Sequence, residues 1–182
     1  SDSRIVDTID DLDRQERIKD LEYNSARWNI QNFPINDPRM GITHVVGPEQ
    51  GITLPGTIVL CGDSHTSTHG ALGALAFGIG GQSGHVLATQ CLWQKPLKQM
   101  RVIVNGTRSL HISAKDLILT IISKIGAGGA FGHVIEYAGD TIEKLSIEER
   151  LTICNMTIES GGRAGLIAPD QTTFNYLKGR PY

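Results

Sequence analysis

The chain has 182 residues, 40% of them hydrophobic, and a formal net charge of −2. This composition is typical of a globular protein, and the charge offers no electrostatic basis for binding a nucleic acid. The sequence contains no apolar stretch long enough to cross a bilayer and no targeting pattern at its N-terminus. We therefore expect a cytoplasmic protein with neither a membrane nor a nucleic acid as partner.

The first forty residues are rich in charge and predict a surface helix over residues 7–28 with an irregular apolar stripe. Two prolines predict a loop over residues 32–39, and residues 41–46 fit either a strand or the end of a helix. We expect residues 1–40 to lead into an α/β region that covers residues 41–182.

A polar triplet, Asp63-Ser64-His65, follows a predicted buried strand at residues 57–61. In α/β proteins the carboxyl ends of strands are where ligands bind. A carboxylate, a hydroxyl and an imidazole together are able to orient a substrate and carry a proton. A polar turn with an Asx-type cap accounts for the same three residues equally well.

Elements of both kinds alternate through the rest of the chain. Small and apolar residues predict a helix over 70–77, a glycine-rich break over 78–81, and a second helix over 84–93. The break does not complete G-x-G-x-x-G, which disfavours a nucleotide site. Strands are predicted at 101–104 and 133–137, and helices at 113–125, 146–160 and 171–178, the first two of these helices with capping boxes. This alternation predicts an α/β fold with a largely parallel sheet.

Asn155 and Glu159 lie four residues apart on one predicted helix, so their side chains share a face. Spacing alone favours an ordinary solvent-exposed pair over a functional one. Asp63, His65 and His69 imitate a metal-binding pattern but lack an obvious further ligand, which disfavours a mononuclear metal site.

The three cysteines, Cys61, Cys91 and Cys154, are widely spaced and form no C-x-x-C. An odd number of cysteines argues against a disulfide framework and for a reducing compartment. Because each lies in an apolar context, we expect buried structural thiols rather than metal or cluster ligands.

Several segments resemble the aconitase superfamily and, within it, the large subunits of 3-isopropylmalate dehydratases. The resemblance extends from about residue 41 to the last residue and rests on these motifs: G-P-E-Q-G at 47–51, C-G-D-S-H-T at 61–66, T-H-G-A at 68–71, C-N-M at 154–156 and A-P-D at 168–170. It implies an aconitase-like three-layer α/β/α fold with a largely parallel sheet, of which this chain is an internal part.

The resemblance also implies an activity, in which 2-isopropylmalate is dehydrated and rehydrated to 3-isopropylmalate in leucine biosynthesis. Such enzymes use a [4Fe–4S] cluster held by three cysteines, a small dicarboxylate substrate and a small subunit as heterodimer partner. None of the cysteines present matches the cluster motifs, so the ligands are expected downstream of Tyr182. We expect this fragment alone to be inactive.

By its motifs, the resemblance assigns catalytic roles to Asp63, His65, His44 and Glu159, with Glu159 contacting the water on the iron. Ser64 would bind a substrate carboxylate, and Asn155 would lie near the cluster sulfurs. Alternatives are a homoaconitase or another hydro-lyase of the family, or a non-catalytic remnant, for example one that binds RNA.

Overall fold

The computed structural model describes residues 12–182, and the chain divides into two compact units, Ser1–Val46 and Gly47–Tyr182. Within the described residues, no helix is both long enough and apolar enough to cross a membrane.

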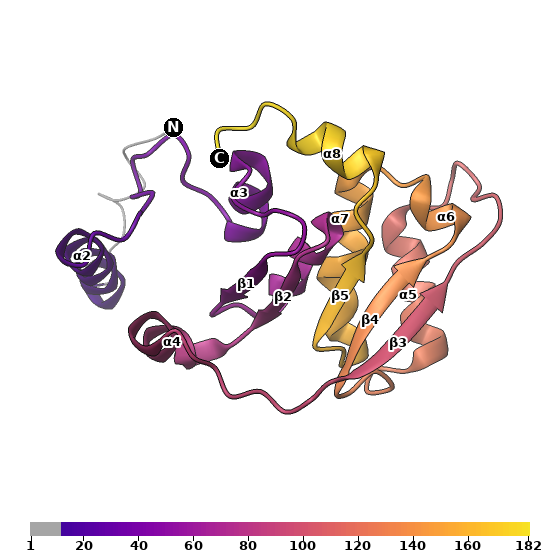
Figure 1. Ribbon diagram of the computed structural model, residues 1–182, viewed down its shortest axis with the longest axis horizontal. Helices are drawn as coiled ribbons and strands as arrows, with labels where there is room; N and C mark the ends of the chain where they lie inside the picture. Colours follow the sequence, from indigo (N-terminus) through magenta and orange to yellow (C-terminus); the bar gives the residue numbers. More distant parts are fainter. Residues whose placement is uncertain (1–11) are drawn as a thin grey trace. The chain divides into compact units, whose positions relative to one another are not determined.

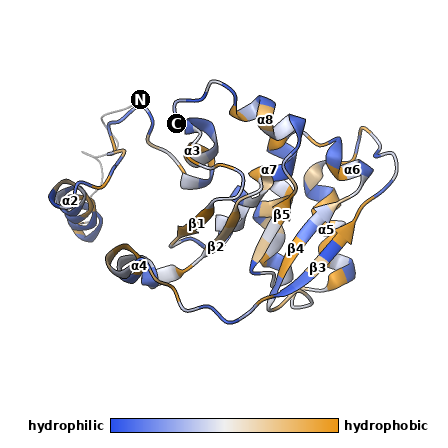
Figure 2. Cartoon of the chain, in the orientation of Figure 1, coloured by the Kyte–Doolittle hydropathy of each residue, from blue (hydrophilic) through white to orange (hydrophobic). Residues whose placement is uncertain are grey.

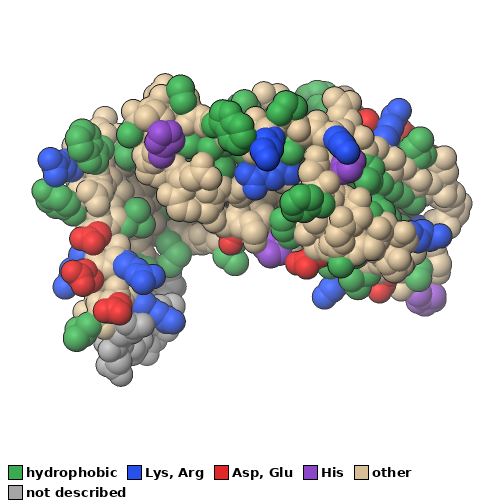
Figure 3. All heavy atoms as spheres, turned by 90° about the horizontal axis from the view of Figure 1, so that it is seen from below, with side chains coloured by type: hydrophobic (Ala, Val, Ile, Leu, Met, Phe, Trp, Pro, Cys, Tyr) green, Lys and Arg blue, Asp and Glu red, His purple; other side chains and the backbone are tan. Residues whose placement is uncertain are grey.

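The first unit contains the charged helix α2 (Leu12–Arg27), which confirms the predicted helix from residue 12 onward. Residues 7–11 of that prediction lie outside the described residues. Acidic and basic side chains are interspersed along α2, as Figure 3 shows at its lower left. The apolar side chains of Leu21 and Tyr23 are exposed, and residues 32–39 form the predicted loop.

Helix α3 (Thr43–Gln50) resolves the ambiguity over residues 41–46 in favour of a helix, which spans the boundary between the units. Pro48 lies inside this helix. The helix ends at Gly51, whose φ of +78° lies in the left-handed region that glycine adopts without a steric penalty.

The strands of the second unit pair in parallel, which confirms the predicted class of fold (Figure 1). Strands β1 (Ile58–Cys61) and β2 (Leu75–Gly78) form one sheet. Strands β3 (Lys98–Ile103), β4 (His133–Ala138) and β5 (Ala164–Ile167) form another, with β4 in the centre. Figure 2 shows β1 and β2 as short hydrophobic segments.

Two predicted helices, α5 (Ala114–Ile125) and α7 (Ile147–Asn155), lie together on one side of the three-stranded sheet (Figure 1). Each begins with a capping box, in which a serine and the acidic residue three positions later bond each other's backbone N–H groups. The two pairs are Ser113 with Asp116 and Ser146 with Glu149. The 3₁₀ helix η3 (Met156–Ser160) continues directly from α7, so the helix predicted to residue 160 changes its winding on the way.

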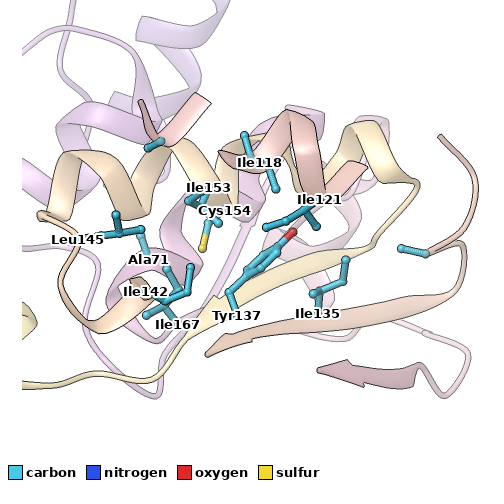
Figure 4. Close-up of a cluster of buried hydrophobic side chains, with 12 residues drawn as sticks. Ala71, Ile118, Ile121, Ile135, Tyr137, Ile142, Leu145, Ile153, Cys154 and Ile167 are labelled. Atoms are coloured by element: carbon cyan, nitrogen blue, oxygen red, sulfur yellow. The ribbon is translucent and has the colours of Figure 1, made fainter. Parts of the chain in front are cut away.

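The main hydrophobic core lies between these helices and the sheet, as Figure 4 shows. Ile135 and Tyr137 of β4 meet Ile118 of α5 and Cys154 of α7 there. Burial raises the pKa of the Cys154 thiol, which keeps it protonated and fits the predicted structural role. Cys91, in contrast, is exposed, so its predicted burial is wrong.

The helix predicted for residues 70–77 is wrong. The 3₁₀ helix η1 (Ser64–Leu72) ends at Gly73, whose φ is +77°, and the chain then enters strand β2. Alternating small and apolar residues fit a short buried strand as well as a helix, so local periodicity did not separate the two. The next helix, α4 (Ser83–Thr89), is shorter than predicted because Gln90 adopts a left-handed conformation at its end.

Three further short elements were not predicted from the sequence: strand β5, helix α6 (Asp140–Glu143) and the 3₁₀ helix η2 (Gly80–Gln82). The predicted terminal helix is confirmed as α8 (Gln171–Leu177).

One buried charge connects α7 to the start of α8. Arg150 is fully buried, and its guanidinium donates two hydrogen bonds to the Asp170 carboxylate, at 2.9 and 2.7 Å. It also donates to the carbonyl oxygens of Leu145 and Glu143. Asp170 in turn caps α8 by accepting from two backbone N–H groups.

The face of the three-stranded sheet opposite α5 and α7 borders a groove of about 840 Å³. Arg101 and Glu136, from neighbouring strands, line this groove and form an exposed ion pair with an N–O distance of 3.2 Å. Exposed pairs of this kind contribute little to stability. Substitutions of either residue therefore serve as controls for substitutions of charged residues elsewhere in the protein.

Candidate active site

The polar triplet lies where the sequence places it, directly after β1, and local hydrogen bonds fix its backbone. The Asp63 carboxylate accepts from the backbone N–H of His65 at 2.6 Å and so caps η1. The hydroxyl of Thr66 donates to the Asp63 carbonyl at 2.6 Å. The Asx-type cap is therefore present, and the same short segment presents all three side chains.

The His65 imidazole lies between two carboxylates from distant parts of the chain. Its Nε2 lies 3.4 Å from Oε1 of Glu159, and its Nδ1 lies 3.7 Å from Oδ1 of Asp63. The Ser64 hydroxyl lies 3.3 Å from the same Nδ1. These side chains remain open to solvent, with 39% exposure for His65 and 54% for Glu159, so a small molecule is able to reach them.

Asn155 and Glu159 lie on the segment that joins α7 to η3, and both face the triplet's helix η1. The Asn155 amide donates to the Thr68 hydroxyl at 2.8 Å. The Ser67 hydroxyl donates to the carbonyl oxygen of Cys154 at 2.7 Å, in a buried position. These bonds fix the two segments against each other. Asn155 is half-buried and Glu159 remains exposed, so the functional role of the pair stays a prediction.

Two glycines permit this close packing. A Cβ on Gly70 would lie 1.7 Å from the carbonyl oxygen of Gly165, which means that η1 lies directly against β5. A Cβ on Gly78 would lie 2.5 Å from the Asp63 carbonyl oxygen. Gly70 and Gly78 therefore serve backbone contact, whereas a Cβ at Gly80 or Gly81 would meet no atom within 4 Å.

Two other histidines considered in the sequence analysis, His69 and His44, are buried, unlike His65. His69 is buried, with its Nδ1 2.7 Å from the Thr53 hydroxyl, and takes a structural position. Within residues 12–182, no group of three His, Cys, Asp or Glu side chains is placed to hold a metal ion. His44 is buried in the Ser1–Val46 unit, and its catalytic role stays a prediction.

Sequence reasoning missed one polar residue beside the triplet. Arg163 lines a small cavity together with Ser64, just before β5. Its only local signal is its place after Gly161-Gly162, and the strand that follows it was itself not predicted.

A profile of the aconitase family (aconitate hydratase) matches residues 2–182, which is nearly the whole chain. The chain therefore belongs to the aconitase family. The class of protein is thus an aconitase-family protein with a parallel α/β fold and a cluster of acid–base side chains.

Curated relatives narrow the comparison to one kind of enzyme subunit. A 3-isopropylmalate dehydratase large subunit from Ruthia magnifica subsp. Calyptogena magnifica is 55% identical over 176 residues, which are 96% of this chain and 38% of the relative. The subunits of the same name from Psychrobacter arcticus and Roseiflexus castenholzii are each 57% identical, over 89% and 91% of this chain and 34% and 35% of their own lengths. The chain thus spans little more than a third of these relatives.

Proposed function

We propose that this chain is part of the large subunit of a 3-isopropylmalate dehydratase. The proposed reaction removes water from 2-isopropylmalate and adds it back to give 3-isopropylmalate, a step of leucine biosynthesis. The observation that carries the proposal is the placement of His65 between the carboxylates of Asp63 and Glu159. These two residues lie 96 positions apart in the chain, so their nearness in sequence does not explain why both lie beside His65. The names of the curated relatives support the choice of substrate.

The reaction needs a proton removed next to a carboxylate and a proton given to the departing hydroxyl. An imidazole flanked by two carboxylates is suited to both tasks, because it is able to take a proton from one side and pass it to the other. We assign this relay to His65, with Asp63 orienting the ring and Glu159 exchanging protons at the opposite nitrogen. Rehydration uses the same groups in the reverse direction.

The remaining roles concern binding and position. The Ser64 hydroxyl would donate to a substrate carboxylate. Asn155 would lie near the cluster and hold η1 against the segment that leads into η3. His44 would supply a further catalytic imidazole. The [4Fe–4S] cluster would be held by cysteines elsewhere in the protein, and a small subunit would complete a heterodimer in the cytoplasm.

The test uses the full-length gene product assembled with its small subunit and reconstituted with iron and sulfide. We expect it to interconvert isopropylmalates, and we expect Glu159→Gln and Asp63→Asn to lower kcat by about 10²-fold or more, as for other general acid–base residues. Glu136→Gln, the same change at the exposed ion pair on β4, is the matched control and should retain full activity.

An assembled enzyme with an intact cluster and no turnover of isopropylmalate would overturn the proposal. Unchanged kcat in both site variants would overturn the assigned roles. A parallel assay with homocitrate and citraconate identifies the substrate among related hydro-lyases: faster turnover of either would replace isopropylmalate as the assignment.

A further inference from the structure

A small cavity adjoins the candidate active site. It has a volume of about 180 Å³ and is lined by residues from four segments: Gly62 and Ser64 after β1, Gly78 and Gly80 at the end of β2, Ile158 of η3, and Arg163 before β5. Four of the six are glycine or serine, so the wall is mainly backbone. Ser64 and Arg163 are the residues of this wall with polar side chains, and both carry hydrogen-bond donors.

Among the described residues, Arg163 contacts an aromatic ring and a neutral amide and has no acidic partner. Its guanidinium lies 4.7 Å from the centre of the Phe77 ring, and Nη2 donates to Oε1 of Gln94 at 3.3 Å. Within residues 12–182, no carboxylate oxygen forms a salt bridge with it, whereas Arg39, Arg101, Arg108 and Arg150 all have such a partner. Partial burial lowers the pKa of Arg163, which means that water compensates its charge incompletely.

A half-buried guanidinium held by a ring and a neutral amide keeps further donors for a ligand. Arginine is suited to a carboxylate because its planar fork is able to donate two parallel hydrogen bonds. The ring contact at Phe77 limits where the side chain can move, and the amide of Gln94 occupies one donor only.

We propose that Arg163 and Ser64 form a carboxylate subsite and that this subsite binds one carboxylate of the diacid substrate. The inference rests on the proposed function and adds a residue that determines specificity. Because Ser64 adjoins His65 in the chain, a carboxylate held here places the neighbouring carbon atoms beside the imidazole and Glu159. Arg163 thus selects a diacid over a monoacid, and it acts by binding rather than by proton transfer.

The first test compares Arg163→Gln and Arg163→Lys in the assembled, reconstituted enzyme. Loss of a charge-assisted bond predicts that kcat/KM for 2-isopropylmalate falls about 10- to 100-fold in Arg163→Gln, mainly through KM. Arg163→Lys keeps the charge but not the fork, so we expect an intermediate KM. Arg101→Gln removes a charge of the same kind from the exposed ion pair on β3 and should leave KM unchanged.

A second measurement separates a binding role from a structural one. Isopropylsuccinate lacks the hydroxyl and is compared with its two monoamides as competitive inhibitors. In the unaltered enzyme one monoamide should bind at least 10-fold more weakly than the diacid, and in Arg163→Gln this difference should disappear. A variant that merely distorts the site would weaken all three inhibitors alike, and that result would overturn the inference.

The two proposals fail in different ways. An unaltered enzyme that does not turn over isopropylmalate defeats the proposed function. An active enzyme in which Arg163→Gln leaves KM and the preference for the diacid unchanged defeats the carboxylate subsite alone.

Discussion

Gly78 is the residue at which packing and the candidate site are most directly linked, and we predict that Gly78→Ala damages both. It ends strand β2, where Cys61 of β1 is its register partner. A Cβ there would lie 2.5 Å from the carbonyl oxygen of Asp63 and 3.0 Å from the Cα of Ser64, whereas ordinary contacts begin at 3.4 Å. The obstacle is backbone, which no rotamer change relieves.

The size of the effect follows from these distances. The loop that carries the triplet must move by about 1 Å to admit the methyl group, and overpacking of this kind costs about 1–3 kcal/mol in free energy of unfolding. A displacement of that size at catalytic groups lowers activity by about 10²-fold. Gly78 does not adopt a left-handed φ, so the expected effect is steric alone.

The assay combines urea-induced unfolding with turnover of 2-isopropylmalate by the assembled enzyme. Gly81→Ala is the matched control, because a Cβ at Gly81 meets no atom within 4 Å and its φ is not left-handed. We expect this control to keep both stability and activity. If Gly78→Ala and Gly81→Ala are indistinguishable in both measurements, the close approach of β2 to the triplet does not position the site as described.

Two further predictions concern the buried charge at Arg150. Asp170→Asn keeps a good helix cap but leaves the buried guanidinium of Arg150 without a counter-charge. Because the Asp170 side chain is 36% exposed, we expect the free energy of unfolding in urea to fall by about 2–3 kcal/mol, against less than about 1 kcal/mol for the control Glu136→Gln. Equal losses in the two variants would contradict the assigned role of the buried charge. Hydrogen bonds from Arg150 also lower the pKa of Asp170 below its ordinary value of 3.8. The stabilisation that ionised Asp170 gives the folded protein is therefore complete above pH 3.8 and is lost as the pH falls through the lower folded-state pKa. The Tm difference between the unaltered protein and Asp170→Asn should therefore be constant above about pH 5 and shrink as the pH falls below 3.8, and a difference that does not change with pH as the solution is acidified would refute the charge interaction.

The local features of the fold could be predicted from the sequence. The capping boxes at Ser113 and Ser146 follow from residues three apart, and the apolar stripe of α5 follows from helical periodicity. The position of Asp63-Ser64-His65 at a strand end likewise needs only the apolar run before it. Such features depend on neighbours in the chain, so a single sequence carries the information.

Misassigned elements were those whose local pattern fits two structures. Residues 75–78 combine small and apolar side chains and form β2, although the same pattern predicted a helix. Strand β5 is four residues long and contains a glycine, which gives too short a signal to detect. Pairing with β1 and β4 decided both cases, because only a sheet neighbour supplies hydrogen-bond partners for such short strands.

The residues of the candidate site also divide into those predicted from local sequence and those placed by the tertiary structure. Sequence alone determined which chemical groups stand together locally: the triplet after β1, and an amide and a carboxylate one helical turn apart. Only the tertiary structure decided that His65 meets Glu159 and that Arg163 shares a cavity with Ser64. The physical reason is that these contacts depend on close backbone packing at glycines such as Gly78. A glycine in the sequence shows that space is available, but it does not reveal which distant segment fills that space.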